Sequence, residues 1–279
     1  MLLLTGAIWG GGFVVMKNAL DTIPVNWLLV FRFAIGALGL SFSLFRNRQK
    51  LTKALVGHSA IVGFLMYAAF ASQTYGLGMT TAGKNALITA IYVVLVPLFG
   101  WYVNKKRPPL RTLAAAFIML IGIALLSWTG DGAVNLGDLL TLLCGVLYAL
   151  EIMAVDRYGA GVDMFQFSCL QYSFVALYAL LPALLFESFP RSWNGEMVFA
   201  LGYCGIAATL VAMTLMNIGI RYASPNYASL LMSTESAFGC LFGVIFLHEL
   251  LSARMTAGGV LILGALLISQ LKPKEKRVA

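Results

Sequence analysis

The sequence predicts an all-α polytopic membrane protein, with ten transmembrane helices arranged as two inverted five-helix repeats. Three observations lead to this fold class: the composition, the apolar runs and a match between the two halves of the chain. Of the 279 residues, 60% are hydrophobic and 11% are charged, whereas soluble domains have about 45–50% and about 25%. Ten helices of about 20 residues would use about 200 residues. This excludes a water-soluble globule and leaves no room for a separate soluble domain.

Ten apolar runs are separated by short connections of charged and turn-forming residues. The expected helices span 2–20, 26–45, 55–77, 82–103, 110–128, 136–157, 163–186, 196–220, 224–247 and 254–271. The first run has no basic n-region and no cleavage signature, so we expect a mature span. The cysteines lie inside apolar runs without CxxC spacing, so we expect neither disulfides nor a metal site.

Lysine and arginine residues concentrate on one side of the predicted helices. With both termini inside the cell, fourteen of them fall on the inner side and four on the outer side, with Arg32 inside the second helix. Cytoplasmic loops retain positive charge, so we expect cytoplasmic termini in a bacterial-type inner membrane. The net charge is +8. Because the cations border the spans, they fit membrane lipid headgroups, and no nucleic acid partner is expected.

The two halves of the chain match when one is shifted against the other. Aligned residues include Leu4, Gly6 and Trp9 with Leu143, Gly145 and Tyr148 at a shift of 139, and Leu98, Phe99 and Gly100 with Leu241, Phe242 and Gly243 at a shift of 143. We assign residues 1–135 to the first repeat and 136–279 to the second, within one transmembrane domain. Five helices is an odd number, so the second repeat enters the membrane from the opposite side. This arrangement suits alternating access, with substrate bound between the halves near the midplane.

Two segments carry a resemblance to a known family. They are TAGKNALITAIYVVLVPLFGWYVNKKRPP (81–109) and SPNYASLLMSTESAFGCLFGVIFLHELLSARMTAGGVLILGALL (224–267), and the opening AIWGGGFVVMK and the FRF of the second helix fit as well. The chain resembles EamA-type transporters of the drug/metabolite transporter superfamily. The resemblance implies ten helices, two inverted repeats, a central cavity and metabolite export. Many members have Glu-Pro in the ninth helix where this chain has Glu235-Ser236, so it lacks that kinking proline.

Polar side chains at helical spacing mark the expected cavity. Thr141, Cys144, Tyr148 and Glu151 share one stripe of the sixth helix, and a polar stripe within a membrane must face protein or water. The repeat maps this stripe onto the first helix, and a similar stripe lies on the fourth. The candidate cavity residues are Thr5, Trp9, Gly12, Gln73, Asn85, Thr89, Tyr92, Thr141, Tyr148, Glu151, Asn217 and Glu235. Each of them has packing within the bundle as its structural alternative.

Three charged residues inside the helices are candidates for proton coupling or an ion pair: Glu235, Glu151 and Arg32. A charge at the bilayer centre costs about 2.5–3.5 kcal/mol on insertion scales, so such a group needs a partner or a neutral form. Function is favoured for Glu235, whereas Glu151 lies nearer the cytoplasmic end. Arg32 is close enough to the outer face for its side chain to snorkel there, which favours a structural role.

The function expected from these features is that of a secondary transporter or facilitator of small metabolites such as amino acids, and the family resemblance implies the export direction. No enzyme motif occurs and no cofactor is expected, so the chain is not expected to be an enzyme. The partners are a small-molecule substrate and membrane lipids, and the protein is a monomer or homodimer. A flippase or exchanger for lipid-linked or nucleotide-linked sugars is the alternative of the same fold, but it would need a more basic cavity. A polytopic membrane enzyme or a non-transporting scaffold is the alternative from another class.

Overall fold

The computed structural model describes residues 1–46, 51–105, 107–108, 110–127, 135–191, 193–222 and 225–270. Within these ranges the secondary structure is helical, with no strand. The elements are α1 (Leu2–Ala19), α2 (Val25–Leu40), α3 (Phe42–Arg46), α4 (Lys53–Met79), α5 (Ala82–Thr89), α6 (Tyr92–Asn104), α7 (Leu110–Ser127), α8 (Leu136–Tyr158), α9 (Met164–Phe186), α10 (Gly195–Gly202), the π-helix η2 (Tyr203–Met213), α11 (Thr214–Tyr222), α12 (Pro225–Met232), α13 (Thr234–Leu247) and α14 (Ala253–Gln270).

The helices are long and apolar enough for a polytopic membrane protein. In the described part of the chain, seven stretches qualify as membrane spans by length and composition: Leu2–Ala19, Val25–Phe45, Lys53–Met79, Ala82–Val103, Leu136–Tyr158, Met164–Phe186 and Gly195–Tyr222. Three shorter apolar helices cover Leu113–Leu125, Thr234–Leu247 and Ala253–Ile268. Residues 47–50 and 272–277, which carry many of the predicted cytoplasmic cations, lie outside the described residues.

Four ranges that the sequence predicts as single helices contain an interruption or a change of helix type. The range 26–45 breaks at Ser41, 82–103 breaks at residues 90–91, 224–247 breaks at Ser233, and 196–220 contains η2. At the second break, the Val93 amide donates to the Ala90 carbonyl and the Val94 amide donates to the Ile91 carbonyl. Such i to i+3 bonds wind the backbone more tightly than an α-helix does, so the turn between α5 and α6 departs from α-helical geometry.

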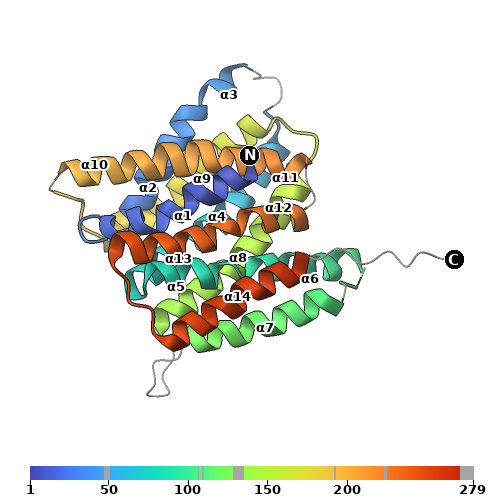
Figure 1. Ribbon diagram of the computed structural model, residues 1–279. Helices are drawn as coiled ribbons and strands as arrows, with labels where there is room; N and C mark the ends of the chain where they lie inside the picture. The colour runs from blue at the N-terminus through green and yellow to red at the C-terminus, as the bar shows by residue number, and fades with distance from the viewer. Residues whose placement is uncertain are drawn as a thin grey trace.

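The elements form a bundle with two peripheral helix pairs and a central group (Figure 1). At one edge α7 packs against α14, and at the other edge α2 packs against α9. Between them, α4 packs against α8, and α1 packs against α13 and η2. The α1–α13 contact is close because α1 presents glycine: a β-carbon on Gly10 would collide with the side chain of Phe238. Small residues are typical where membrane helices approach one another this closely.

Candidate functional site

The central helices enclose a small cavity of about 20 Å³, which is room for about one water molecule. Four residues come from α1, two each from α4 and η2, and one each from α2, α8 and α13. The lining residues are Trp9, Gly12, Phe13, Met16, Arg32, Phe70, Gln73, Tyr148, Cys204, Ala208 and Glu235. The cavity therefore lies where the first half of the chain meets the second, and it is nearly closed in this conformation.

Arg32 reaches this cavity from α2 and is only 2% exposed. Its Nε donates to Thr209 Oγ1 at 2.7 Å, and its Nη1 donates to Met16 Sδ at 3.3 Å. The guanidinium carbon lies 4.3 Å from the centroid of the Phe70 ring, a distance at which the cation is attracted to the ring face. The expectation that Arg32 snorkels to the outer face is wrong, because η2 and α4 hold the side chain in the interior.

Glu235 approaches the cavity from the other side. It is 4% exposed and lies in the first turn of α13, directly after the break at Ser233. A carboxylate in a first helical turn interacts favourably with the partial positive charge of the helix N-terminus. Tyr148 is within electrostatic range of both Glu235 and Arg32. Among the described residues, Lys84 and Asp138 form the ion pair. Arg32, Glu151 and Glu235 are therefore not part of an ion pair within these residues.

Five aromatic rings form a continuous wall beside the Arg32 guanidinium. Along the chain of contacts Tyr172, Phe33, Phe70, Tyr148 and Tyr92, successive ring centroids are 6.1, 5.1, 5.4 and 6.2 Å apart. These separations are typical of tilted and edge-to-face aromatic pairs. The wall joins α9, α2, α4, α8 and α6, and two of its rings, Phe70 and Tyr148, line the cavity.

Polar side chains of α1 attach this helix to η2. Trp9 Nε1 donates to the Ala208 carbonyl at 2.9 Å, and Thr5 Oγ1 donates to the Ala212 carbonyl at 3.1 Å. Trp9 therefore lines the cavity and also bonds to the π-helix. Thr5 is fully buried at the α1–η2 contact and is not a lining residue.

A second polar network joins α4, α5 and α8 behind the cavity wall. Asn85 Nδ2 donates to Thr141 Oγ1 at 2.7 Å and to the Gln73 carbonyl at 3.2 Å. Gln73 Nε2 donates in turn to Thr89 Oγ1 at 3.3 Å. Of these residues only Gln73 lines the cavity. The Tyr92 hydroxyl is buried in the same region, next to Glu235.

Glu151 belongs to a third, separate network between α8, α9 and α11. Its Oε1 accepts a hydrogen bond from Gln171 Nε2 at 2.8 Å. Asn217 Nδ2 donates to Gln171 Oε1 and to Ser168 Oγ, each at 2.9 Å. All four side chains are fully buried, and none is a cavity-lining residue. Glu151 and Asn217 therefore lie apart from the cavity that the sequence assigned to them.

The structure brings together only part of the predicted set. Six of the predicted residues line the cavity: Trp9, Gly12, Arg32, Gln73, Tyr148 and Glu235. The other candidates are Thr5, Asn85, Thr89, Tyr92, Thr141, Glu151 and Asn217, which are buried around it. The sequence did not identify the lining residues Phe13, Met16, Phe70, Cys204 and Ala208. They are apolar or small, and a search for polar stripes gives no signal for such residues.

Comparison with known proteins identifies the family. The model of the EamA-like transporter family matches residues 1–128 and 135–270. The chain belongs to the EamA-like transporter family. This EamA-like protein is 30% identical to an uncharacterized transporter of Archaeoglobus fulgidus, over 97% of its own length and 85% of that protein. A Salmonella typhimurium protein named "Probable amino-acid metabolite efflux pump" is 25% identical, over 100% of this chain and 96% of that one.

A solved structure shares the fold of this EamA-like transporter. A crystal structure aligns with it at a TM-score of 0.70 and 19% sequence identity, covering 96% of this chain and 95% of that one. The family and the names of its relatives support a membrane transporter and not an enzyme. In the described residues, no group of three or more His, Cys, Asp or Glu side chains is placed to hold a metal ion.

Two half-buried charges, Lys17 and Glu249, hold the adjoining ends of α4 and α5 on the predicted outer side. Lys17 Nζ donates to the carbonyls of Leu77 and Thr80 at 2.7 and 2.8 Å, at the C-terminus of α4. The two carboxylate oxygens of Glu249 accept from the Ala82 and Gly83 amides at 2.6 and 3.0 Å, at the N-terminus of α5. A cation at the end of one helix and an anion at the start of the next are both favourable. We call these contacts of Lys17 and Glu249 the outer clasp.

Proposed function

We propose that this protein exports small zwitterionic metabolites such as amino acids by alternating access, with the central cavity as its substrate site. The observation that carries the proposal is that Arg32 and Glu235 both line one aromatic-walled cavity, where the two halves of the chain meet. A substrate carboxylate suits the planar guanidinium of Arg32. Aromatic faces suit an ammonium group or an apolar substituent.

Alternating access needs two halves that can exchange conformations, and several features support an inverted repeat. The family model matches the chain twice. The breaks at residues 90–91 and at Ser233 coincide within one residue under the shift of 143. The same shift relates Lys105 and His248, the non-glycine residues with positive φ in the described ranges, and each ends its helix in a left-handed conformation.

Helix contacts support the same symmetry. The α4–α8 contact corresponds under the repeat to the contact between η2 and α1, and the α8–α6 contact corresponds to that between α1 and α13. The pairs α2–α9 and α7–α14 each map onto themselves, and the α5–α13 contact corresponds to the contact between α12 and α6. We therefore propose ten transmembrane helices in two inverted repeats, 1–135 and 136–279, with both termini in the cytoplasm.

Within this proposal the buried residues have different roles. Arg32 binds the substrate carboxylate, while Trp9, Gly12, Gln73 and Tyr148 form the walls. Glu235 is the coupling group that takes up and releases a proton as the cavity changes sides, because it lines the cavity and forms no ion pair with any other described residue. Six of the remaining candidates hold the surrounding helices together through hydrogen bonds: Thr5, Asn85, Thr89, Thr141, Glu151 and Asn217. The Tyr92 ring packs against Tyr148.

The composition of the cavity also separates this proposal from the sugar-nucleotide alternative. A phosphate-rich substrate would need several cations, whereas the lining contains one guanidinium and one carboxylate. The relatives named as amino-acid metabolite efflux pumps favour the amino-acid proposal.

The test is counterflow of radiolabelled amino acids into liposomes that contain the purified protein. We expect uptake of label only when the liposomes are preloaded with the same class of zwitterionic compound. Preloading with amines that lack a carboxylate, or with nucleotide sugars, should give the background rate of protein-free liposomes. Counterflow with nucleotide sugars but not with amino acids would contradict the proposal.

A further inference from the structure

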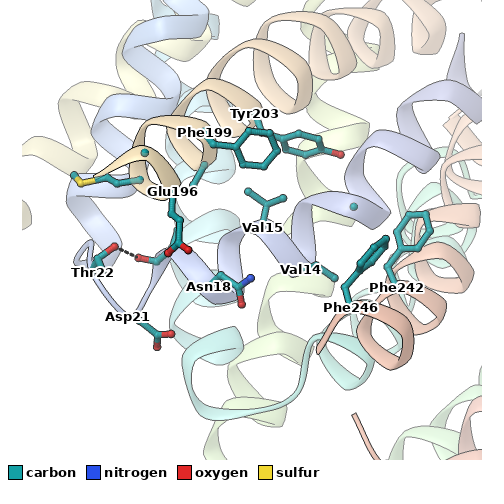
Figure 2. Close-up of a pocket in the computed structure, with 15 residues that line it drawn as sticks. Val14, Val15, Asn18, Asp21, Thr22, Glu196, Phe199, Tyr203, Phe242 and Phe246 are labelled. Atoms are coloured by element: carbon teal, nitrogen blue, oxygen red, sulfur yellow. Dashed lines mark hydrogen bonds between the residues drawn. The ribbon is translucent and has the colours of Figure 1, made fainter. Parts of the chain in front are cut away.

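A groove of about 900 Å³ lies between α1, α10 and α13, outside the central cavity (Figure 2). Its volume is within the range of about 300–1,000 Å³ that is typical of small-molecule pockets. Tyr203, the first residue of η2, completes one wall. The lining residues are Gly11, Val14, Val15, Asn18, Ala19, Asp21, Thr22, Gly195, Glu196, Met197, Phe199, Ala200, Tyr203, Phe242 and Phe246.

The two ends of this groove differ in chemistry. Figure 2 shows Glu196 and Asp21 together at one end, with Asn18 beside them. Phe242 and Phe246 lie at the opposite end. Although the chain has a net charge of +8, both charged lining residues are acidic. The groove is therefore amphipathic, with a negative end and an apolar end.

Glu196 is stabilised by the start of α10, and Asp21 lies near Lys17, whose ammonium group donates to carbonyls at the end of α4. Glu196 lies in the first turn of α10, where the helix N-terminus stabilises a carboxylate. Asp21 lies after the end of α1, in the connection to α2. Two carboxylates that come from different elements to the same end of one groove attract a cation more strongly than either does alone.

Tyr203 separates the groove from the central cavity. Its hydroxyl donates to the Ile8 carbonyl at 2.7 Å, so the ring is fixed against α1. Gly11 and Tyr203 line the groove, while their chain neighbours Gly12 and Cys204 line the cavity. A β-carbon on Gly11 would lie 2.6 Å from the Tyr203 hydroxyl oxygen, so glycine is needed for this close approach. The groove is thus a distinct site that shares one wall with the cavity.

We propose that this groove binds a free amphipathic ammonium compound. The ammonium group lies between Asp21 and Glu196, and the apolar part of the compound lies along Phe199, Phe242 and Phe246. Any lipid chain could make the apolar contacts, but the two carboxylates select for a positively charged head group. The proposal is independent of the function assigned to the central cavity.

The test uses a long-chain alkylamine labelled with dansyl, and a dansyl-labelled fatty acid of the same chain length as the matched anion. Binding to the purified protein in maltoside micelles is followed by energy transfer from tryptophan to dansyl. We expect saturable binding of the amine at least tenfold tighter than that of the acid. The double variant Asp21→Asn, Glu196→Gln should weaken amine binding at least tenfold and leave acid binding unchanged.

Three further variants distinguish binding in the groove from general adsorption to the protein. Asp163→Asn removes a carboxylate from another surface pocket and keeps its helix-capping ability, so amine binding should not change. Val15→Trp fills the groove and should abolish saturable binding. Val198→Trp makes the same change on an exposed face of α10 that does not line the groove, and should leave binding unchanged.

Three results would overturn the proposal. The first is equal affinity for amine and acid, and the second is amine binding that survives Val15→Trp. The third is displacement of the amine by phosphatidylethanolamine that is added to the micelles at a lower concentration than the amine. This result would assign the groove to a lipid headgroup. Each variant is first compared with the parent protein in size-exclusion profile and thermal unfolding, and an unfolded variant is replaced by Val15→Phe.

Discussion

Arg32 and Glu235 are the two charged side chains that line the central cavity, and the protein stabilises them in different ways. Arg32 has Thr209, Met16 and the Phe70 ring as partners. Glu235 has the N-terminal end of α13. A charge held by neutral partners still attracts an opposite charge from a substrate, because its own charge is not cancelled.

We expect Arg32→Lys to weaken amino-acid binding about tenfold, which corresponds to about 1.4 kcal/mol. Lysine keeps the charge but loses the planar group that faces Phe70 and bonds to Thr209. The measurement is the substrate concentration for half-maximal counterflow. An amine analogue without the carboxylate is the control, used as a weak inhibitor of amino-acid counterflow whose inhibition constant should be the same in both proteins. If Arg32→Lys changes the two compounds equally, Arg32 is not the carboxylate partner.

Glu235→Gln preserves the size of the side chain while removing its charge and its ability to titrate. We expect the variant to retain counterflow of substrate between equal pH values and to lose accumulation driven by a pH gradient. Both are measured in the same liposome preparation, with Glu196→Gln as a carboxylate control outside the central cavity. A loss of counterflow would instead identify Glu235 as a contact of the substrate ammonium group. Unchanged behaviour in both assays would leave it a structural residue.

Among the helices, η2 is the least expected element. Eleven residues, Tyr203–Met213, adopt π geometry, although π-helices are rare and most contain a single turn. Thr209 Oγ1 donates to the Cys204 carbonyl five residues earlier, and the same oxygen accepts from Arg32. The wider helix therefore provides a hydrogen-bond acceptor for the buried guanidinium. No residue type along this segment distinguishes it from an ordinary apolar helix.

The outer clasp gives a prediction about α4 and α5. Replacing Glu249 by Gln removes the negative charge at the start of α5, so this end of the protein should open more often. Native Cys204 lines the central cavity and reports such opening. In a background that lacks the other three cysteines, we expect Glu249→Gln to raise the rate at which an impermeant thiol reagent labels Cys204 from outside at least threefold. Equal labelling rates in the variant and the parent protein would show that the outer clasp does not control access to the central cavity. Glu196→Gln serves as the control variant.

For the whole molecule, orientation in the membrane follows from the distribution of cations. We expect Lys53→Cys to be labelled by an impermeant thiol reagent only after cell lysis, and Arg191→Cys to be labelled in intact cells. Both positions are exposed in the structure. A protein without its native cysteines provides the background for both. Labelling of Lys53→Cys in intact cells would reverse the proposed topology.

The sequence by itself determined the helical architecture, because the length and spacing of apolar runs follow directly from the thickness of a membrane. The helix bounds agree with the expected ranges within a few residues, apart from the internal breaks. The sequence also identified Trp9, Glu235 and Tyr148 as cavity candidates, because polar and aromatic groups at regular helical spacing are visible without coordinates. In the structure these three residues line the small central cavity.

Only the tertiary structure decided which buried polar groups meet. Glu151 and Tyr148 lie on the same stripe of α8, yet Glu151 bonds to Gln171 in a separate network while Tyr148 lines the cavity. Arg32 is near the outer end of its helix in sequence, but η2 and α4 hold it inside. A helical stripe specifies a face and not the neighbour that covers it. That neighbour depends on the packing of segments far apart in the chain, and at η2 on a local helix geometry that residue spacing does not reveal.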